Sequence, residues 1–202
     1  MSLNCIARIV ALLAASLAFS PWAQAEEPKL DFAAIQAEAQ KGVAHSQYVL
    51  GLMYGLGRGV RRDDARAVEW FRRAAQQGEA NAQFSLGVMY DIGVGVRQDD
   101  TQAVEWFRKA AQQGHAGAQF SLGMSFYLGQ GVRQDYAKAA EWFLKSAQQG
   151  NSGARFFLGR MYEHGRGVGQ NTATAKEWYG QACDSGDQDG CDEYARLNKA
   201  GF

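Results

Sequence analysis

The chain has 202 residues, with 21 basic and 21 acidic side chains and a formal net charge of zero. Its basic residues form no long run, so the chain lacks the basic patch with which proteins neutralise a nucleic-acid backbone, and nucleic-acid binding is not expected. The length suffices for one elongated domain or for one compact domain of ordinary size.

The first 25 residues have the pattern of a signal peptide. Arg8 precedes an apolar run at 9–19, and Ala23-Gln24-Ala25 has the small-x-small pattern of a signal-peptidase site. The run is shorter than the roughly 20 residues that a membrane-spanning helix needs. We therefore expect cleavage before Glu26 and export to the periplasm or beyond the cell, with no stable membrane insertion afterwards. The alternative is a retained signal anchor.

The next segment, 26–42, is expected to form an N-terminal capping helix. Phe32, Ile35 and Ala39 share one face of this helix, as they would in a second helix of a repeat that lacks its tryptophan. Such a helix would close the core at this end of a repeat array.

The central part of the chain repeats itself with a period of 36 residues. The segment AVEWFRRAAQQG at 67–78 recurs as AVEWFRKAAQQG at 103–114 and as AAEWFLKSAQQG at 139–150, and a divergent copy, AKEWYGQACDSG, occupies 175–186. A fixed period of this length indicates a solenoid or a propeller. We expect four repeats, at 43–78, 79–114, 115–150 and 151–186.

Each repeat contains two stretches with helical spacing of apolar residues. In the second repeat, Ala82, Leu86 and Tyr90 lie at i, i+4 and i+8 of the stretch 82–91, and a broad apolar face runs along 99–113. A propeller would show alternation instead. The predicted fold class is therefore all-α, a solenoid of antiparallel helix pairs stacked side by side.

Polar residues and glycines mark the helix ends. A short polar side chain that can cap a helix precedes each second helix, and Gln-Gln-Gly at the end of these helices is typical of a C-terminal glycine with positive φ. The predicted N-caps are Asp63, Asp99, Asp135 and Asn171.

A G-x-G-V loop joins the two helices of each repeat, as at 93–96. A phosphate-binding glycine loop follows a strand and opens directly into a helix. Here the loop follows a helix and the next helix begins several residues later, so a tight helix–helix turn is favoured over a nucleotide site. A further glycine recurs inside each first helix, for example Gly87. Its recurrence predicts that the partner helix passes too close there for a Cβ atom.

The repeated tryptophans, Trp70, Trp106, Trp142 and Trp178, are expected to lie in the core between layers, because each repeat leaves an apolar face that only its neighbour covers. A glutamate precedes a basic residue by four positions in three repeats, an order that favours ion pairs along a helix. These expected pairs are Glu69 with Arg73, Glu105 with Lys109, and Glu141 with Lys145.

Two cysteines, Cys183 and Cys191, remain after signal-peptide removal. One even pair in an exported chain favours one disulfide over two free thiols. A metal site with two sulfurs and no nearby histidine is not expected.

The pattern A-x-x-x-L-G-x-M-Y, then G-x-G-V, D, A-x-x-W-F-x-K-A-A and Q-G, resembles the Sel-1-like repeat, a relative of the tetratricopeptide repeat. The resemblance covers about 43–186. It implies an α/α superhelical solenoid that serves as an adaptor for protein complexes, with bacterial members often exported and linked to envelope processes, signalling or host interaction. Cys183 and Cys191 resemble the C-x7-C signature of the cysteine-rich secreted branch, in which a disulfide joins one repeat to the next. Residues 187–202 are expected to form a C-terminal capping helix.

Catalytic chemistry has little support in the sequence. The three histidines, His45, His115 and His164, have no carboxylate or cysteine at metal-ligand spacing, and no serine-nucleophile motif is present. No cofactor, metal or catalytic residue is expected.

Three columns of the first helices vary between repeats and are candidates for binding a partner. By resemblance to tetratricopeptide-like solenoids, they would line a concave groove that holds an extended peptide or a helix. The alternative is neutral surface variation. The candidate residues are Val49, Leu52, Ser85, Val88, Asp91, Met124, Tyr127, Phe157, Arg160 and Glu163.

The predicted function is that of an exported repeat scaffold that binds a protein or peptide partner. A monomer is expected, because polar outer faces on the capping helices discourage end-to-end stacking. The alternative is an envelope enzyme or binder acting on cell-wall or β-lactam-type substrates, as suggested for the cysteine-rich branch. Such an enzyme would need convergent polar groups in one pocket, and the sequence shows no such cluster.

Overall fold

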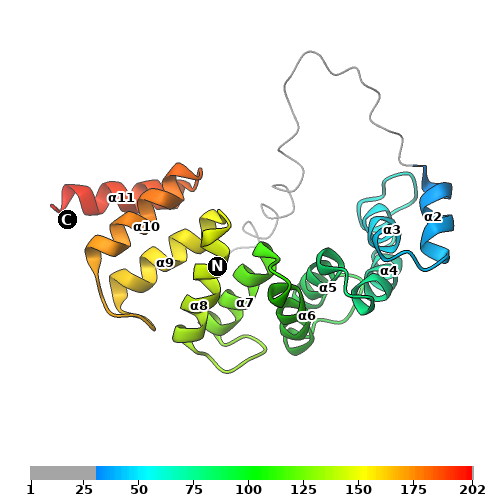
Figure 1. Ribbon diagram of the computed structural model, residues 1–202, viewed down its shortest axis with the longest axis horizontal. Coiled ribbons are helices and arrows are strands. Elements are labelled where there is room, and N and C mark those ends of the chain that lie inside the picture. The colour runs from blue at the N-terminus through cyan, green and yellow to red at the C-terminus, as the bar shows by residue number, and fades with distance from the viewer. Residues whose placement is uncertain (1–30, 202) are drawn as a thin grey trace, which may run out of the picture. The chain divides into compact units, whose positions relative to one another are not determined.

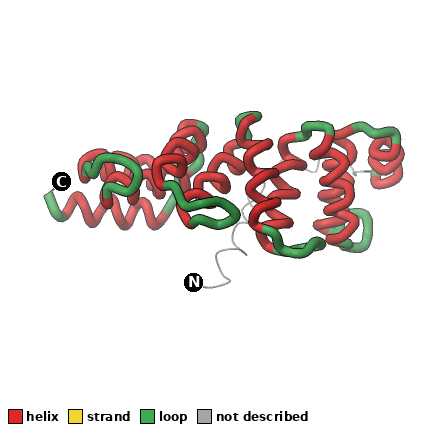
Figure 2. Tube along the Cα trace, turned by 90° about the horizontal axis from the view of Figure 1, so that it is seen from below, coloured by secondary structure: helices red, strands yellow, loops and turns green. Residues whose placement is uncertain are grey.

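The computed structural model describes residues 31–201, and within them every regular element is an α-helix (Figures 1 and 2). The predicted signal peptide, 1–25, and the first residues of the predicted capping segment lie outside the described residues. The helices form a series in which each packs against the next in the chain. Their bounds are α2 Phe32–Gln40, α3 Ala44–Leu56, α4 Asp64–Gln76, α5 Ala80–Ile92, α6 Asp100–Gln112, α7 Ala116–Leu128, α8 Tyr136–Gln148, α9 Ser152–His164, α10 Thr172–Asp184 and α11 Gln188–Lys199.

The predicted helix pairs are confirmed. First helices α3, α5, α7 and α9 alternate with second helices α4, α6, α8 and α10, while α2 precedes the first pair and α11 follows the last (Figure 1). The fold is the predicted all-α solenoid.

The predicted helix ends are also confirmed. The Asp99 carboxylate accepts a 3.0 Å hydrogen bond from the backbone N–H of Gln102, and the caps predicted in the other repeats make the same bond. Each second helix is followed by a glycine with positive φ, such as Gly78 at 94°. These ends satisfy backbone groups that a helix leaves unpaired.

At two glycine positions of the repeat, neighbouring atoms leave no room for a larger residue. A Cβ on Gly87, inside α5, would lie 2.6 Å from the Phe107 ring of α6, which confirms the predicted close approach. In the loop, a Cβ on Gly95 would lie 2.2 Å from the backbone oxygen of Asp64, in the preceding second helix. The second glycine of G-x-G-V therefore lets one repeat pack on the start of a helix in the repeat before it.

The tryptophans are less buried than expected. Trp70, Trp106, Trp142 and Trp178 are half-buried, while the aromatic residue that follows each one is almost fully enclosed. The enclosed rings, with their exposed fractions, are Phe71 at 4%, Phe107 at 3%, Phe143 at 0% and Tyr179 at 1%. The core position belongs to this second aromatic because it is the ring that fills the space beside the first-helix glycine.

The predicted glutamate–cation pairs are wrong. Within residues 31–201, no ion pair joins Glu69, Glu105 or Glu141 to the basic residue four positions later. The cations of Arg73, Lys109 and Lys145 lie instead over the rings of Trp70, Trp106 and Trp142, at 4.5, 4.0 and 4.2 Å from the ring centroid. Positions i and i+3 also face each other on a helix, and a half-buried indole attracts a cation in a less hydrated setting than an exposed carboxylate does.

Each second helix is joined to the following first helix through residues at two positions that recur in every repeat; we call each set of equivalent positions a column. At an internal junction, Gln83 donates a 3.1 Å hydrogen bond from Nε2 to the backbone oxygen of Ala75, and its Oε1 accepts a 2.8 Å bond from Gln113. Gln47 and Gln119 repeat this arrangement. At the last junction the same two columns hold Cys183 and Cys191, which form a disulfide with a Cα–Cα distance of 4.5 Å.

Candidate functional site

The first helices carry a partly exposed apolar surface at the edge of the core, where Leu52, Val88 and Met124 also pack against core residues. Residues at i, i+3 or i+4 and i+7 share one side of a helix, and the residues on this side are at least partly exposed. Leu56 and Leu128 are 55% and 49% exposed, among the most exposed large apolar side chains in residues 31–201. We call this surface the first-helix face; it consists of Val49, Leu52 and Leu56 of α3, Ser85, Val88 and Ile92 of α5, and Ser121, Met124 and Leu128 of α7.

Several predicted binding residues lie on this face or continue it. Five of them, Val49, Leu52, Ser85, Val88 and Met124, are partly exposed members of the first-helix face, and Arg160 occupies the corresponding position on α9. Asp91 is exposed near the end of α5, beside the face. The structure thus brings these seven residues to one side of the helix array.

Tyr127 does not face solvent as expected. It is 7% exposed, its ring lies 5.5 Å from that of Phe157, and its hydroxyl accepts a 2.8 Å hydrogen bond from Nη1 of Arg166 in the next repeat. The residue at this position differs between repeats. The bulky Tyr127 packs against the following first helix, whereas Gly55 occupies the equivalent position in the first repeat. Variation between repeats therefore did not indicate exposure at this position.

Phe157 is also engaged within the protein. Its ring stacks on Phe143 at a centroid distance of 5.3 Å and contacts Phe120 at 6.0 Å. It remains partly exposed. Its main contacts are those of a residue that joins α9 to α7 and α8.

Glu163 likewise has internal partners. Its carboxylate accepts a 2.8 Å hydrogen bond from the Tyr179 hydroxyl and pairs with the Arg196 guanidinium of α11. Burial alone would raise the pKa of Glu163, but the hydrogen bonds from Tyr179 and Arg196 outweigh it and hold the pKa below its usual value. Burial of the Tyr179 hydroxyl and its hydrogen bond to Glu163 raise the pKa of Tyr179. This cluster joins α9, α10 and α11 and is structural.

The sequence analysis missed the members of the first-helix face that end the helices, among them its two exposed residues, Leu56 and Leu128. Leu56, Ile92 and Leu128 end their helices, each directly before the glycine that caps the helix. Their signal was available, because each lies four residues after a predicted member of the face, namely Leu52, Val88 or Met124.

Metal chemistry has no visible basis in the described part of the chain. Residues 31–201 contain no group of three or more histidine, cysteine, aspartate or glutamate side chains that could hold a metal ion. No helix among them is both long enough and apolar enough to cross a membrane.

The chain has the architecture of an α-solenoid repeat protein. Its helices are paired with a 36-residue period, and equivalent residues join each repeat to the next. The Sel1 repeat family model matches residues 44–79, 80–115, 116–151 and 152–187. The chain therefore belongs to the Sel1 repeat family. Proteins built from these repeats are generally scaffolds that mediate protein–protein interaction.

Two solved structures and one curated protein illustrate the similarity. A protective antigen of uropathogenic Escherichia coli strains, described as displaying an SLR fold, is 36% identical with a TM-score of 0.83; the match covers 86% of this chain and 37% of the antigen. A Sel1 repeat protein from Oxalobacter formigenes is 28% identical with a TM-score of 0.76, covering 84% of this chain and 68% of that one. An Arabidopsis thaliana protein, the ERAD-associated E3 ubiquitin-protein ligase component HRD3A, is 47% identical over 45 residues, which are 22% of this chain and 7% of the plant protein.

Proposed function

We propose that this chain is an exported Sel1 repeat scaffold that binds a protein or peptide partner along its first-helix face, as an adaptor in envelope processes, signalling or host interaction. The observation that carries the proposal is the exposure of Leu56 and Leu128 beside Leu52, Val88 and Met124, which pack against the core and remain partly exposed. Exposed apolar patches on folded proteins mark interaction sites.

The mechanism is the presentation of a surface that is ordered before the partner arrives. The close contacts of Gly87 and Gly95 fix how α5 packs on α6 and on the preceding repeat, so the apolar side chains keep their spacing. The scaffold therefore loses little conformational entropy when the partner binds. Either an amphipathic helix or an extended peptide could cover side chains spaced in this way.

The proposed binding residues are the seven predicted ones that share this side of the array, together with the three that end the first helices. Arg160 adds a positive charge at the α9 end of the face, where α3, α5 and α7 have apolar residues. A partner with an acidic group beside its apolar surface would match this arrangement.

Export is supported by the Cys183–Cys191 disulfide, because such bonds persist in oxidising compartments. It is also supported by the signal-peptide pattern of the first 25 residues. Mass spectrometry of the protein recovered from intact cells tests both: we expect an N-terminus at Glu26 and an oxidised cysteine pair. A full-length reduced form in the cytoplasm would overturn the proposed export.

Site-specific crosslinking tests the binding surface. A photoreactive residue replaces Leu128 on the first-helix face, and a matched one replaces Leu144 on α8, a second helix, where the leucine is 41% exposed. We expect one defined protein to crosslink from position 128 and not from 144, and Met124→Glu to weaken its capture at least about tenfold because it places a charge in an apolar contact. Equal capture from both positions would refute the proposed surface.

A further inference from the structure

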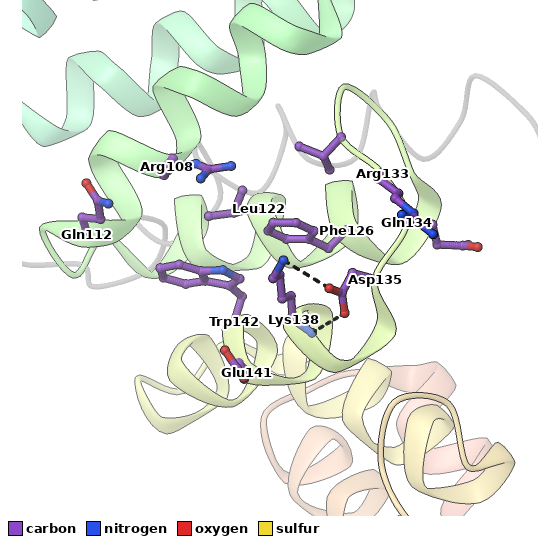
Figure 3. Close-up of a pocket in the computed structure, with 11 residues that line it drawn as sticks. Arg108, Gln112, Leu122, Phe126, Arg133, Gln134, Asp135, Lys138, Glu141 and Trp142 are labelled. Atoms are coloured by element: carbon purple, nitrogen blue, oxygen red, sulfur yellow. Dashed lines mark hydrogen bonds and ion pairs between the residues drawn. The ribbon is translucent and has the colours of Figure 1, made fainter.

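A cleft of about 770 Å³ lies between α6 and α8, with α7 at its base (Figure 3). The partly exposed Trp142 ring of α8 forms an apolar wall, while Leu122 and Phe126 of α7 at the base are 0% and 8% exposed. The remaining lining residues are Arg108, Gln112, Val132, Arg133, Gln134, Asp135, Lys138 and Glu141.

The cleft differs from its counterpart one repeat earlier at two lining positions, where Phe126 stands for Tyr90 and Lys138 for Gln102. In the second repeat, Tyr90 takes the place of Phe126, and its hydroxyl accepts a 3.0 Å hydrogen bond from Nη2 of Arg72. Arg108 is the counterpart of Arg72 in α6. Because Phe126 has no hydroxyl, Arg108 loses this partner, and it has no hydrogen bond or ion pair to any residue in 31–201.

The charges around the cleft favour an anion. Lys138 pairs with Asp135 at 3.3 Å, so these two charges offset each other. Arg108 and Arg133 form no ion pair with a described carboxylate, and Glu141 is the only other acidic residue of the lining within the described chain. Guanidinium groups bind carboxylates with two parallel hydrogen bonds.

The cleft also has room for more than one residue of a ligand. A neighbouring hollow of about 530 Å³ shares Arg108, Gln112 and Val132 with it and continues along α6 to Val104 and Thr101. Two adjoining hollows on either side of Arg108 suit an extended chain better than a single small molecule.

We propose that the α6–α8 cleft is a second binding site, for a peptide segment that places an aromatic or aliphatic side chain next to a carboxylate. The apolar side chain packs on Trp142 and on the small exposed part of Phe126, and the carboxylate binds Arg108. This site is independent of the proposed function, because Leu122 and Phe126 project from the opposite side of α7 from Met124 and Leu128.

Three short peptides separate the two parts of this recognition. The probes are acetyl-Gly-Glu-Phe-Gly-amide, the same peptide with Gln in place of Glu, and the same peptide with Ala in place of Phe. Two-dimensional NMR follows the indole N–H signal of Trp142, assigned with Trp142→Phe. We expect the Glu-Phe peptide to shift this signal and to bind at least tenfold more tightly than either of the other two.

Two variants and a matched control test the residues. Phe126→Tyr introduces the residue that this column holds in the other repeats, as at Tyr90, so the fold should accept it, and its hydroxyl should engage Arg108. We expect Phe126→Tyr and Arg108→Gln each to weaken the Glu-Phe peptide at least tenfold. The control Arg72→Gln makes the same change one repeat earlier and should leave binding unchanged.

Several outcomes would overturn the proposal. Equal affinity for the Glu and Gln peptides would remove the role of the carboxylate, and an unshifted Trp142 signal at millimolar peptide would exclude the cleft. An equal loss of binding in Arg72→Gln would show a general charge effect. Since Arg108 is exposed, Arg108→Gln leaves the core intact and decides the matter even if Phe126→Tyr proves unstable.

Discussion

The internal junctions and the C-terminal junction place different bonds between the same two columns of residues. Internally, the amide groups of Gln47, Gln83 and Gln119 bridge to a backbone oxygen of the preceding helix. At the end of the array, Cys183 and Cys191 form a covalent bond instead. An internal first helix is covered by a repeat on each side, whereas α11 packs mainly on α10 and buries only Gly190 and Leu197.

This difference shows where each kind of bond is needed. A hydrogen bond suffices where apolar burial on both sides already holds a helix in place. A terminal helix has about half of that burial, and a disulfide compensates by restricting the unfolded chain. The junction before it is intermediate, because Arg155 replaces the glutamine and reaches the oxygens of Ala147 and Gln181.

Removal of the disulfide is expected to have the largest effect. Replacement of both Cys183 and Cys191 by alanine should destabilise the α10–α11 junction by roughly 2–3 kcal/mol, the chain-entropy value for so short a loop. Hydrogen exchange measures this locally: amides of α11 should exchange faster, while those of α5 to α8 should keep their protection. Wild-type protein treated with reductant should behave in the same way, and uniform loss of protection along the array would contradict the comparison.

An internal junction should respond to loss of its glutamine by a smaller amount. Gln119→Ala removes the side-chain donor of the Ala111 oxygen, which keeps only its bond from the Gly114 N–H, and should cost about 1 kcal/mol, measured by urea unfolding. Gln148→Ala is the matched control, because Gln148 is exposed at the end of α8 and its side chain makes no hydrogen bond within residues 31–201. The control should change stability by less than about 0.5 kcal/mol. Equal losses in the two variants would show that the buried amide of Gln119 does not hold the junction.

Much of this architecture could be predicted from the sequence because it depends on local backbone rules. The Asp99 cap, the positive φ of Gly78 and the close approach at Gly87 each follow from a residue type at a fixed place in the period. These rules need no knowledge of the neighbouring repeat. The fold class and the position of the helix pairs were therefore accessible.

The candidate site was predicted only in part because side-chain direction depends on the neighbouring repeat. Tyr127 and Phe157 vary between repeats, which suggested exposure, yet each packs against the other across α7 and α9. The tryptophans looked like core residues, but the next aromatic occupies the space beside the glycine. The effect of Phe126 on Arg108 follows from the hydrogen bond between Tyr90 and Arg72, which the sequence alone does not indicate.

Acid should loosen the C-terminal junction through Glu163. The pKa of Glu163 lies below its usual 4.5, so the stability that this carboxylate contributes is present above that pH and is lost as the pH falls through its lower folded value. Glu163→Gln should therefore reduce the pH dependence of α11 protection below about pH 4.5, by an amount near 1 kcal/mol. Hydrogen exchange corrected for intrinsic rates measures this, and an unchanged pH profile would remove Glu163 from the junction.

The internal junction before α7 should respond to acid at a higher pH, through His115, and with the smallest effect. Its Nδ1 accepts a 3.0 Å hydrogen bond from the Ala118 N–H, which requires a neutral ring, and the ring stacks on Phe84 at 4.5 Å. Burial lowers the pKa of His115 below its usual 6.5, against a smaller opposing effect of the Glu79 charge. The unfolded chain then binds a proton more readily, so stability falls as the pH drops below about 6.5 towards the folded value.

His115→Asn separates this effect from that of Glu163. Asn151 makes the same cap one repeat later, accepting a 2.9 Å bond from the Ala154 N–H, so asparagine should preserve the cap and remove the titration. We expect the variant to lose a pH dependence of about 0.5 kcal/mol in thermal unfolding between pH 7 and pH 5, the low end of the range for a helix cap. The acid response of α11 below pH 4.5 should stay the same, because Glu163 is untouched. If both responses disappear together, the two junctions unfold as one unit and do not differ in the way that their bonds suggest.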